Sequence, residues 1–496
     1  MKLNKLLNKV SVIQVVGNAE LKEIDNLSID SRNVNKGSIF FAIKGQKTDG
    51  HNFVIDVVNK GVSAVVIDND QKFPDDIFKH NDCVKILVKD TKISLAEFSN
   101  AFYDEPSKKL KVIGITGTKG KSTTAFFVKN IFKTNENKCG LIGTIANYIG
   151  DEEVKTSLTT PQSHEINFLF AEMIKKNCTH CVIEVSSHAL DLHRVDFVNF
   201  QSAIFTNITA DHMDYHQTFE NYFIAKKILF EMINENGFVI FNNDDPNGEK
   251  IVADSKGKRI SYGTKNNSDV RIHNIKYDLD GTRFEIHWQN KIYKAETKLI
   301  GIFNAYNAAS SFAVAMANKV EPQIAIEGIK NTPQVPGRFE VVSKKNKKVI
   351  VDYSHTSDSL KQALEAIHHI VKDERKIYTV FGCGGDRDKT KRPIMGAIAS
   401  ELSDRVYVTS DNPRTEDPFV IIDEIVHGIK KNNYRIIENR EEAIRSAIFE
   451  SEDDAVILIA GKGHENYQEI NGVRKHFSDK EISEKYLNEW AKWKLH

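Results

Sequence analysis

A glycine-rich segment from Lys111 to Thr124, with the sequence KVIGITGTKGKSTT, has the composition of a phosphate-binding loop. Apolar residues at its start predict a strand, and the residues from Lys121 onward predict a helix. Glycines let successive backbone N–H groups turn toward one anion, and the helix N-terminus adds its positive dipole. Lys121 can then contact the terminal phosphates of a nucleotide, and the Ser122 hydroxyl can ligate Mg²⁺. The strict pattern G-x-x-x-x-G-K-[ST] is broken because Ile115 occupies its first position, and a plain structural turn is the alternative interpretation.

A carboxylate lies at the end of another predicted buried strand. Glu184 is embedded in the apolar run 182–185, which is followed by Ser-Ser-His. Ligands of doubly wound sheets lie beyond the carboxyl ends of the strands. A carboxylate beside a nucleotide loop can hold Mg²⁺ through oxygen, as this hard cation requires. The alternative role of Glu184 is an ion pair with a nearby lysine or arginine.

A histidine-rich turn follows the strand predicted over residues 203–206. It contains His212, Asp214 and His216, which are also ligand types of transition-metal sites. Because no thiolate accompanies these side chains, a Mg²⁺ site with one imidazole and several oxygens is the favoured interpretation.

Three further polar segments each follow a predicted strand in the last third of the chain. Because such segments leave a parallel sheet at the same edge, we expect them to converge. Together they hold guanidinium groups for a carboxylate and carboxylates for an ammonium group, as a zwitterionic amino acid requires. The candidate residues for this amino acid are Arg387, Asp411, Asn412, Pro413, Arg414, Gly461 and Glu465.

The elements that position these residues predict an α/β chain of three domains. At 496 residues the chain is too long for one ordinary core. Alternating short apolar runs and polar turns predict an N-terminal α/β domain over residues 1–109. Strand and helix alternation predicts a central doubly wound parallel sheet over 110–333, with an antiparallel hairpin appended between residues 270 and 300. A Pro- and Gly-rich connector then leads to a second doubly wound, Rossmann-like domain over 334–496.

Composition excludes several classes of function. Lys plus Arg equals Asp plus Glu, at 68 each, so no global charge draws the chain to nucleic acid or an anionic bilayer. No stretch reaches the roughly 18 uninterrupted apolar residues of a membrane span, and the N-terminus has no signal-type apolar run. Five scattered cysteines fit a reducing compartment, so we expect a cytoplasmic protein. Cys178 and Cys181 match C-x-x-C, but the predicted strand follows the pair, so we expect buried structural cysteines and no redox dithiol.

The run from Gly117 to Ser122 resembles the ATP loop of the Mur ligases, the ATP-dependent amide-forming enzymes of peptidoglycan precursor synthesis. The resemblance covers essentially the whole chain and keeps the family's order of motifs. It implies ATP as co-substrate, Mg²⁺ as cofactor and an acyl-phosphate intermediate. Lys119, Leu192 and Ser357 depart from the residues usual in the family. The ATP-binding residues that it implies are Gly117, Thr118, Lys119, Gly120, Lys121, Ser122, Thr123, Asn304, Arg338, Asp352 and His355.

The same resemblance implies the catalytic and metal-binding residues. It assigns catalysis to Lys121, Glu184, His212 and Lys226, with Ser122 and Glu184 on one Mg²⁺ and His212 and Lys226 on a second. The segment ending in Lys226 matches the family segment whose lysine is carbamylated to N6-carboxylysine. An ammonium group with a pKa of about 10.4 must lose a proton to ligate a metal near pH 7, whereas CO₂ converts the free amine into a stable anion. From the residues alone, a lysine on a helix surface is the alternative.

The resemblance also implies the substrates. The form Asp-Asn-Pro-Arg at residues 411–414 occurs in members that add meso-2,6-diaminopimelate, whose distal carbon carries both an amine and a carboxylate. L-Lysine lacks that carboxylate and would leave Arg414 unpaired. The implied binding residues for UDP-N-acetylmuramoyl-L-alanyl-D-glutamate are Ile29, Ser31, Gln46, Lys47, Thr48, Thr159, Thr160, Ser186 and Arg194.

Three alternatives stay open at this point: a lysine-adding ligase, another Mur or folate-polyglutamating enzyme, and a switch or binding protein that hydrolyses ATP without forming an amide. We expect a monomer without nucleic-acid or membrane partners.

Overall fold

The computed structural model describes residues 1–45, 48–156, 158–372 and 374–494. Its residues form two compact units. The first comprises Met1–His273, Ile286–Tyr293 and Tyr306–Ile329, and the second comprises Asn274–Glu285, Lys294–Ala305 and Lys330–His496. The domain boundaries predicted at 109/110 and 333/334 stay predictions. Over the described ranges, no helix has both the length and the apolar character that crossing a bilayer would demand.

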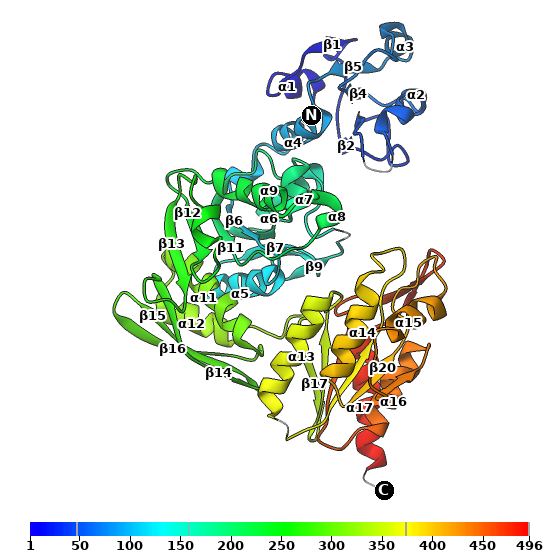
Figure 1. Ribbon diagram of the computed structural model, residues 1–496. Coiled ribbons are helices and arrows are strands. Elements are labelled where there is room, and N and C mark those ends of the chain that lie inside the picture. Colours follow the sequence, from blue (N-terminus) through cyan, green and yellow to red (C-terminus); the bar gives the residue numbers. More distant parts are fainter. Residues whose placement is uncertain (46–47, 157, 373, 495–496) are drawn as a thin grey trace. The chain divides into compact units, whose positions relative to one another are not determined.

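The N-terminal part of the first unit is a five-stranded sheet (Figure 1). Its strand order is β1-β5-β4-β3-β2, and only β1 runs antiparallel to its neighbour. The strands are β1 (Gln14–Val16), β2 (Asn26–Ser28), β3 (Ser38–Phe41), β4 (Ala64–Ile67) and β5 (Val84–Leu87). The helices are α1 (Leu3–Leu7), α2 (Val54–Asn59), α3 (Asp75–His80) and α4 (Thr91–Phe102), with 3₁₀ turns at Gly50–Phe53 and Pro106–Lys108. The alternation of strands and helices agrees with the α/β character predicted for this part of the chain.

The central sheet has eleven strands in the order β16-β15-β14-β13-β12-β11-β6-β10-β7-β8-β9. Each strand from β14 to β7 in this order runs parallel to its neighbour, as predicted. At the β7 edge, β8 and β9 are added as antiparallel strands. The parallel strands are buried on both faces, which explains their continuous apolar runs. They are β6 (Lys111–Thr116), β7 (Cys139–Ile142), β10 (His180–Glu184), β11 (Phe200–Phe205), β12 (Phe238–Asn242) and β13 (Lys258–Gly263). The two additions are β8 (Asn147–Ile149) and β9 (Glu152–Val154).

Three strands, β14 (Val270–Asp278), β15 (Gly281–Trp288) and β16 (Lys291–Thr297), stand where a two-stranded hairpin was predicted. The third strand is mostly exposed, so its sequence carries little apolar alternation. The helices of this region are α5 (Lys121–Thr134), α6 (Ser163–Lys175), α7 (Ser187–Asp191), α8 (Met213–His216), α9 (Phe219–Glu231), α10 (Gly248–Ile251), α11 (Ile302–Ala317) and α12 (Pro322–Lys330). Cys178 and Cys181 are free and buried, as predicted for structural cysteines.

The second unit is built around a six-stranded sheet in the order β17-β18-β22-β19-β20-β21. All neighbours are parallel except β17 and β18. The strands are β17 (Glu340–Lys344), β18 (Lys347–Asp352), β19 (Ile377–Phe381), β20 (Arg405–Val408), β21 (Tyr434–Ile436) and β22 (Val456–Ala460), and β23 (Tyr467–Ile470) pairs with β24 (Val473–His476) in a separate ribbon. The helices are α13 (Ser357–Val371), α14 (Lys391–Glu401), α15 (Pro418–Val426), α16 (Arg440–Glu450) and α17 (Asp479–Trp493).

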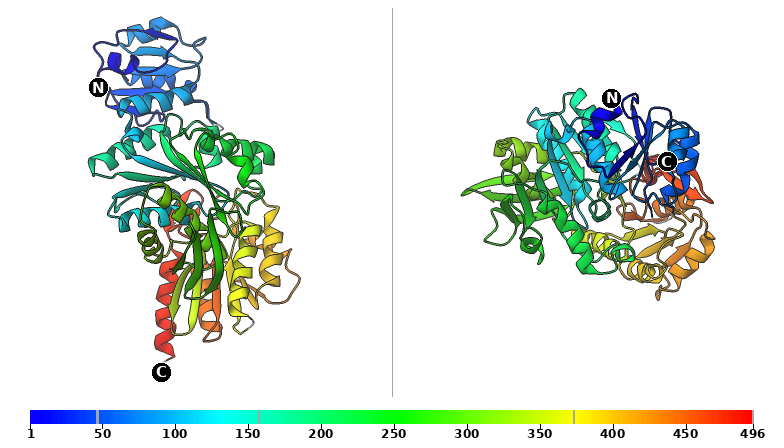
Figure 2. Two further views of the ribbon diagram at one scale, coloured as in Figure 1. Left: turned by 90° about the vertical axis from the view of Figure 1, so that its left-hand side faces the viewer. Right: turned by 90° about the horizontal axis from the view of Figure 1, so that it is seen from above.

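Both faces of this sheet are covered, as a doubly wound fold requires (Figures 1 and 2). Side chains of Ile350 and Leu458 pack with α13, α14 and α15 in one core. Side chains of Val351 and Ile459, one residue further along each strand, pack with α16 and α17 in another. This alternation follows from the two-residue period of a strand. Because β18, β22, β19 and β20 are parallel, the loops at their carboxyl ends leave the sheet at one edge.

Candidate active site

The phosphate-binding loop connects β6 to α5, as the glycine pattern predicts. Gly117 and Gly120 have φ angles of +149° and +87°, which L side chains rarely adopt. A Cβ on Gly117 would also collide with the Thr206 hydroxyl. Lys121 folds over the loop, and its Nζ donates to Gly117 O at 2.8 Å and Thr118 O at 3.0 Å. The loop carbonyls thus hold the Lys121 ammonium group over the strand-to-helix turn.

The Asn207 side chain is hydrogen-bonded to both the backbone N–H and the backbone carbonyl of Lys119. Lys119 N donates to Asn207 Oδ1 at 3.0 Å, and Asn207 Nδ2 donates to Lys119 O at 3.1 Å. Main-chain atoms of Lys119 thus hold this part of the loop to Asn207.

Glu184 lies at the end of β10 and is only 1% exposed. Its Oε2 accepts hydrogen bonds from Ser122 Oγ and Thr144 Oγ1, both at 3.0 Å, and its Oε1 accepts from Thr144 N at 3.0 Å. The predicted partners Ser122 and Glu184 are therefore in contact. Thr144 was not predicted, although it follows β7, at the strand-end position where ligand residues gather.

The donor set beside this loop fits Mg²⁺. A hydroxyl oxygen and a carboxylate oxygen are hard ligands, and Mg²⁺ in nucleotide sites takes few protein ligands because phosphates and water supply the rest. Within the described part of the chain, no group of three or more His, Cys, Asp or Glu side chains could hold a metal ion by itself.

The predicted peptide-binding residues of the central sheet surround Glu184. Thr160 Oγ1 donates to the Glu184 carbonyl at 2.8 Å and accepts from Ser186 N at 3.0 Å. Arg194 Nη1 donates to Thr160 O at 3.0 Å, while Thr144 Oγ1 and Thr159 Oγ1 lie 3.1 Å apart. The buried Arg194 Nε has no hydrogen-bond partner among the described residues, which leaves a donor for a bound anion.

Lys226 of α9 meets the phosphate-binding loop from the other side. Its side chain is buried, and its Nζ donates to Gly117 O at 3.0 Å, the same carbonyl that accepts from Lys121. The Nζ also lies 4.5 Å from the centre of the Tyr222 ring. Burial, reinforced by the charge of Lys121, holds the pKa of Lys226 well below its usual range. A neutral amine is the form that reacts with CO₂, so this environment suits carbamylation.

His212 lies beside this lysine in an aromatic cluster. Its ring centre is 5.0 Å from that of His188 and 6.3 Å from that of Tyr222. The side chain is half exposed, and burial lowers the pKa of His212 below its ordinary value. A neutral imidazole of this kind can ligate a metal.

The residues predicted to bind the UDP sugar lie in the N-terminal sheet region. Ser31 O accepts from Lys60 Nζ at 2.7 Å, and the neighbouring Asp30 and Arg32 form an ion pair. Ile29 is partly buried against the core, and Thr48 is exposed. Gln46 and Lys47 lie outside the described residues.

Four predicted nucleotide contacts belong to the second unit. Asp352, at the end of β18, accepts from Phe339 N at 2.7 Å and from the Ser354 hydroxyl, and burial raises its pKa. The Arg338 guanidinium lies 4.7 Å from the centre of the Tyr353 ring. His355 Nδ1 lies 3.0 Å from Tyr353 O, and Asn304 is buried in α11. Arg338, Asp352 and His355 thus gather around the carboxyl end of β18.

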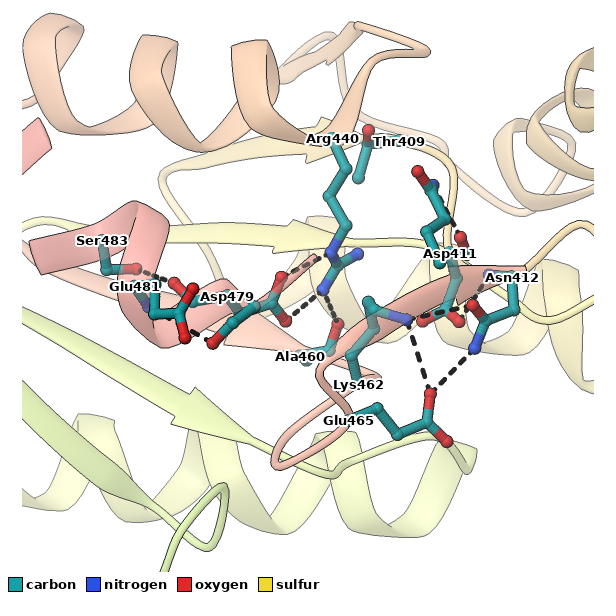
Figure 3. Close-up of polar contacts among 12 residues, drawn as sticks. Thr409, Asp411, Asn412, Arg440, Ala460, Lys462, Glu465, Asp479, Glu481 and Ser483 are labelled. Atoms are coloured by element: carbon teal, nitrogen blue, oxygen red, sulfur yellow. Dashed lines mark hydrogen bonds and ion pairs between the residues drawn. The ribbon is translucent and has the colours of Figure 1, made fainter. Parts of the chain in front are cut away.

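The three predicted acceptor segments converge at one edge of the six-stranded sheet, because they follow β19, β20 and β22. Arg414 Nη1 donates to Gly385 O at 2.6 Å, and Gly385 N donates to Asn412 O at 2.9 Å. Asn412 Nδ2 donates to Glu465 Oε2 at 2.8 Å (Figure 3). Gly461 has a φ of +116°, and a Cβ there would approach Asp411 Oδ2 to 2.6 Å. Of the candidates, Arg387 is exposed. Lys462 was not predicted, and its Nζ contacts both Asn412 Oδ1 and Glu465 Oε2.

Models of protein families match three segments of the chain. They are described as the Mur ligase family catalytic domain at residues 23–103, the Mur ligase middle domain at 115–315, and the Mur ligase glutamate ligase domain at 337–463. The chain belongs to the Mur ligase family. Members of this family are ATP-dependent ligases of peptidoglycan precursor synthesis, so the activity class expected from the sequence is confirmed.

Relatives match this Mur ligase over almost its whole length. Proteins named UDP-N-acetylmuramoyl-L-alanyl-D-glutamate–2,6-diaminopimelate ligase from Clostridium acetobutylicum and Clostridium botulinum are 42% and 40% identical to it over 492 residues, covering 99% of this chain and 100% of each relative. A solved structure of a ligase of the same name is 27% identical, covers 100% of this chain and 99% of its own, and superposes with a TM-score of 0.70.

Proposed function

We propose that this Mur ligase joins meso-2,6-diaminopimelate to the D-glutamate side-chain carboxylate of UDP-N-acetylmuramoyl-L-alanyl-D-glutamate, with hydrolysis of ATP to ADP and phosphate. The observation that carries the proposal is the position of Glu184. Its carboxylate accepts from Ser122 of the phosphate-binding loop, and its carbonyl accepts from Thr160 of the peptide-binding group. A nucleotide and a substrate carboxylate bound by these two groups would be neighbours.

The chemistry needs activation because a carboxylate is a poor electrophile. The D-glutamate carboxylate oxygen attacks the γ-phosphorus of ATP, the bond from that phosphorus to the β-γ bridging oxygen breaks, and ADP leaves an acyl phosphate. Lys121 and the N-terminus of α5 hold the terminal phosphates, where charge develops in the transition state. The free amine of the acceptor then attacks the acyl carbon, an amide bond forms, inorganic phosphate leaves, and the nitrogen loses a proton.

Ser122 and Glu184 are the residues proposed to hold one Mg²⁺, and His212 with carbamylated Lys226 to hold a second. Bound Mg²⁺ neutralises charge on the phosphate oxygens. Hydrogen bonds within the chain hold two of these proposed ligands in place. Thr144 orients the Glu184 carboxylate, and Gly117 O accepts from the amine of Lys226.

Arg414 and Glu465 are proposed to recognise the acceptor. The Arg414 guanidinium suits the distal carboxylate of meso-2,6-diaminopimelate, and the Glu465 carboxylate suits an ammonium group. Lysine would leave Arg414 unpaired, at a cost of about 3–5 kcal/mol if the charge is buried on binding. The acceptor residues Arg387, Asp411, Asn412, Pro413 and Gly461 complete this group.

The remaining assignments follow from the same activity. Ile29, Ser31 and Thr48 are proposed to contact the UDP sugar, and Asn304, Arg338, Asp352 and His355 the nucleotide. ATP and a UDP-linked substrate are available in the cytoplasm, which is where the proposal locates the reaction. All proposed site residues belong to one chain, and a monomer is the proposed form.

Coupled release of ADP tests the proposal. Purified protein with ATP, Mg²⁺ and UDP-N-acetylmuramoyl-L-alanyl-D-glutamate is given meso-2,6-diaminopimelate or L-lysine, and the amide product is identified by mass. We expect turnover with meso-2,6-diaminopimelate and at least about 100-fold lower kcat/KM with lysine. Faster turnover with lysine would indicate a lysine-adding ligase, and ATP hydrolysis indifferent to both substrates would indicate a switch protein.

A further inference from the structure

Lys462 places a completely buried ammonium group inside the proposed acceptor-binding group. The residue is 0% exposed and follows Gly461 at the end of β22. Its Nζ donates to Asn412 Oδ1 at 3.0 Å and lies 3.4 Å from Glu465 Oε2 (Figure 3). Burying a charge is costly unless it is paired and hydrogen-bonded. These contacts therefore couple the conformation of Lys462 to two residues proposed to meet the acceptor.

Lys462 and the backbone N–H of Glu469 together fix the orientation of the Asn412 side chain. Asn412 Oδ1 accepts from Lys462 Nζ and from Glu469 N, the latter at 2.9 Å. Both partners are donors only, so the amide oxygen must face them and the amide nitrogen must point the other way. That nitrogen donates to Glu465 Oε2 at 2.8 Å. Lys462 and Asn412 thus engage the same oxygen of Glu465 and orient its carboxylate.

A buried ion pair anchors the strand from which Lys462 projects. Arg440 Nη2 donates to Ala460 O, the last residue of β22, at 3.0 Å, and Asp479 binds the same guanidinium (Figure 3). Gly461 and Gly463 then take positive φ angles on either side of Lys462. The lysine is therefore presented from a backbone that is held on both of its flanks.

We propose that Lys462 is a positioning residue for the acceptor amino acid: it holds Glu465 as a charged, oriented carboxylate that receives the acceptor's ammonium group. The inference rests on the proposed function of this edge of the sheet. It assigns Lys462 a role in affinity for the acceptor, separate from ATP binding at the phosphate-binding loop.

The charges around Glu465 predict a pH signature. Burial raises the pKa of Glu465, and the positive charge of Lys462 opposes that rise. Among the described residues, the titratable or charged groups that interact with Glu465 also include Asp411, Tyr353, Arg440, Tyr467 and Arg474. Removing Lys462 raises the pKa of Glu465 further. Because a carboxylate is charged only above its pKa, binding of the ammonium group is then lost at a higher pH.

The test compares wild-type protein with Lys462→Met in the ADP-release assay, over pH 6 to 9 and a range of meso-2,6-diaminopimelate concentrations. We expect the KM for meso-2,6-diaminopimelate to rise about 10- to 100-fold at pH 7, with the KM for ATP within about 2-fold of wild type. The acid limb of kcat/KM should move up by about one pH unit or more. Lys462→Arg, which keeps the positive charge, should recover part of the affinity. Lys462→Gln, which loses the charge but keeps a donor, replaces the Met variant if that variant does not fold.

Lys347 offers a matched control. It is a second fully buried lysine of the same unit, at the start of β18, and its Nζ donates to the carbonyls of Ser451, at 3.0 Å, and Ile448. We expect Lys347→Met to leave the KM for meso-2,6-diaminopimelate and the acid limb unchanged. In a Glu465→Gln background, Lys462→Met should no longer move the acid limb.

A Lys462→Met protein with the wild-type KM and acid limb would overturn the inference, as would an equal shift in Lys347→Met. Failure of the wild-type protein to use meso-2,6-diaminopimelate would instead overturn the proposed function, so the two failures are distinguishable.

Discussion

Arg440 and Asp479 form a doubly hydrogen-bonded ion pair in which neither side chain is exposed. Arg440 Nε donates to Asp479 Oδ1 and Nη2 to Oδ2, both at 2.8 Å. The two residues begin α16 and α17, the helices that cover one face of the six-stranded sheet. The pair therefore links two helix N-termini to the end of β22, directly before the acceptor segment that carries Lys462 and Glu465 (Figure 3).

Replacing Asp479 with Asn should destabilise the second unit by about 3–5 kcal/mol, because the Arg440 charge would remain buried without a partner. Urea unfolding followed by tryptophan fluorescence, to which Trp490 of the same core contributes, measures the loss. The double variant Arg440→Met, Asp479→Leu removes both charges and should recover most of the stability. An Asp479→Asn protein as stable as the wild type would contradict the role assigned to the pair.

Replacing Thr144 with Val should weaken the use of Mg²⁺. The change removes the hydroxyl that donates to Glu184 Oε2 and lies 3.1 Å from Thr159 Oγ1, but it keeps the backbone bond to Glu184 Oε1. Loss of such supporting contacts costs about 10- to 100-fold in metal affinity. The measurement is the Mg²⁺ concentration that gives half-maximal ADP release. Thr144→Ser, which retains the hydroxyl, should behave like the wild type, and a Val variant with unchanged Mg²⁺ dependence would refute this role.

Replacing Lys226 with Met should lower kcat by at least about 100-fold, because the proposed second Mg²⁺ would lose its carbamate ligand. With ¹³C-labelled bicarbonate, NMR should detect a carbamate signal in the wild-type protein and none in the variant. Its neighbour Lys227 pairs with Asp254 on the helix surface, so Lys227→Met should keep both activity and the signal. A wild-type protein that is fully active without a carbamate signal would exclude carbamylation as a requirement.

Lys347 should make stability depend on pH above neutrality. Burial lowers the pKa of Lys347 from 10.5 to about 8 in the folded chain. Between these values the unfolded chain binds the proton and the folded chain does not, so stability rises as pH increases from about 8 toward 10.5. Urea unfolding at pH 7.5 and at pH 10 should show this rise in the wild type and a smaller one in Lys347→Met. Equal slopes in the two proteins would rule out Lys347 as its source.

Several features were predictable because they depend on neighbours in the chain. The phosphate-binding loop needs an apolar strand, glycines that reach positive φ, and a helix that begins with Lys121. All three lie within the short segment from Lys111 to Thr124. The three acceptor segments were predictable for a related reason. Each follows a buried strand, and strands of one parallel sheet end at the same edge.

Other features depend on residues that are distant in the sequence. Thr144 reaches Glu184 across 40 positions, and Lys462 reaches Asn412 across 50. Nothing in the local pattern distinguishes Lys226, which is buried on Gly117 O, from Lys227, which is paired at the surface.

Local pattern thus predicted the order of elements, the nucleotide loop and the residue types suited to a charged amino acid. Packing of the sheets determined which threonine orients the Glu184 carboxylate, which lysine loses contact with water and which amide faces Glu465. The reason is that burial and hydrogen-bond partners are set by chain segments that meet only after folding, and these in turn set pKa and orientation.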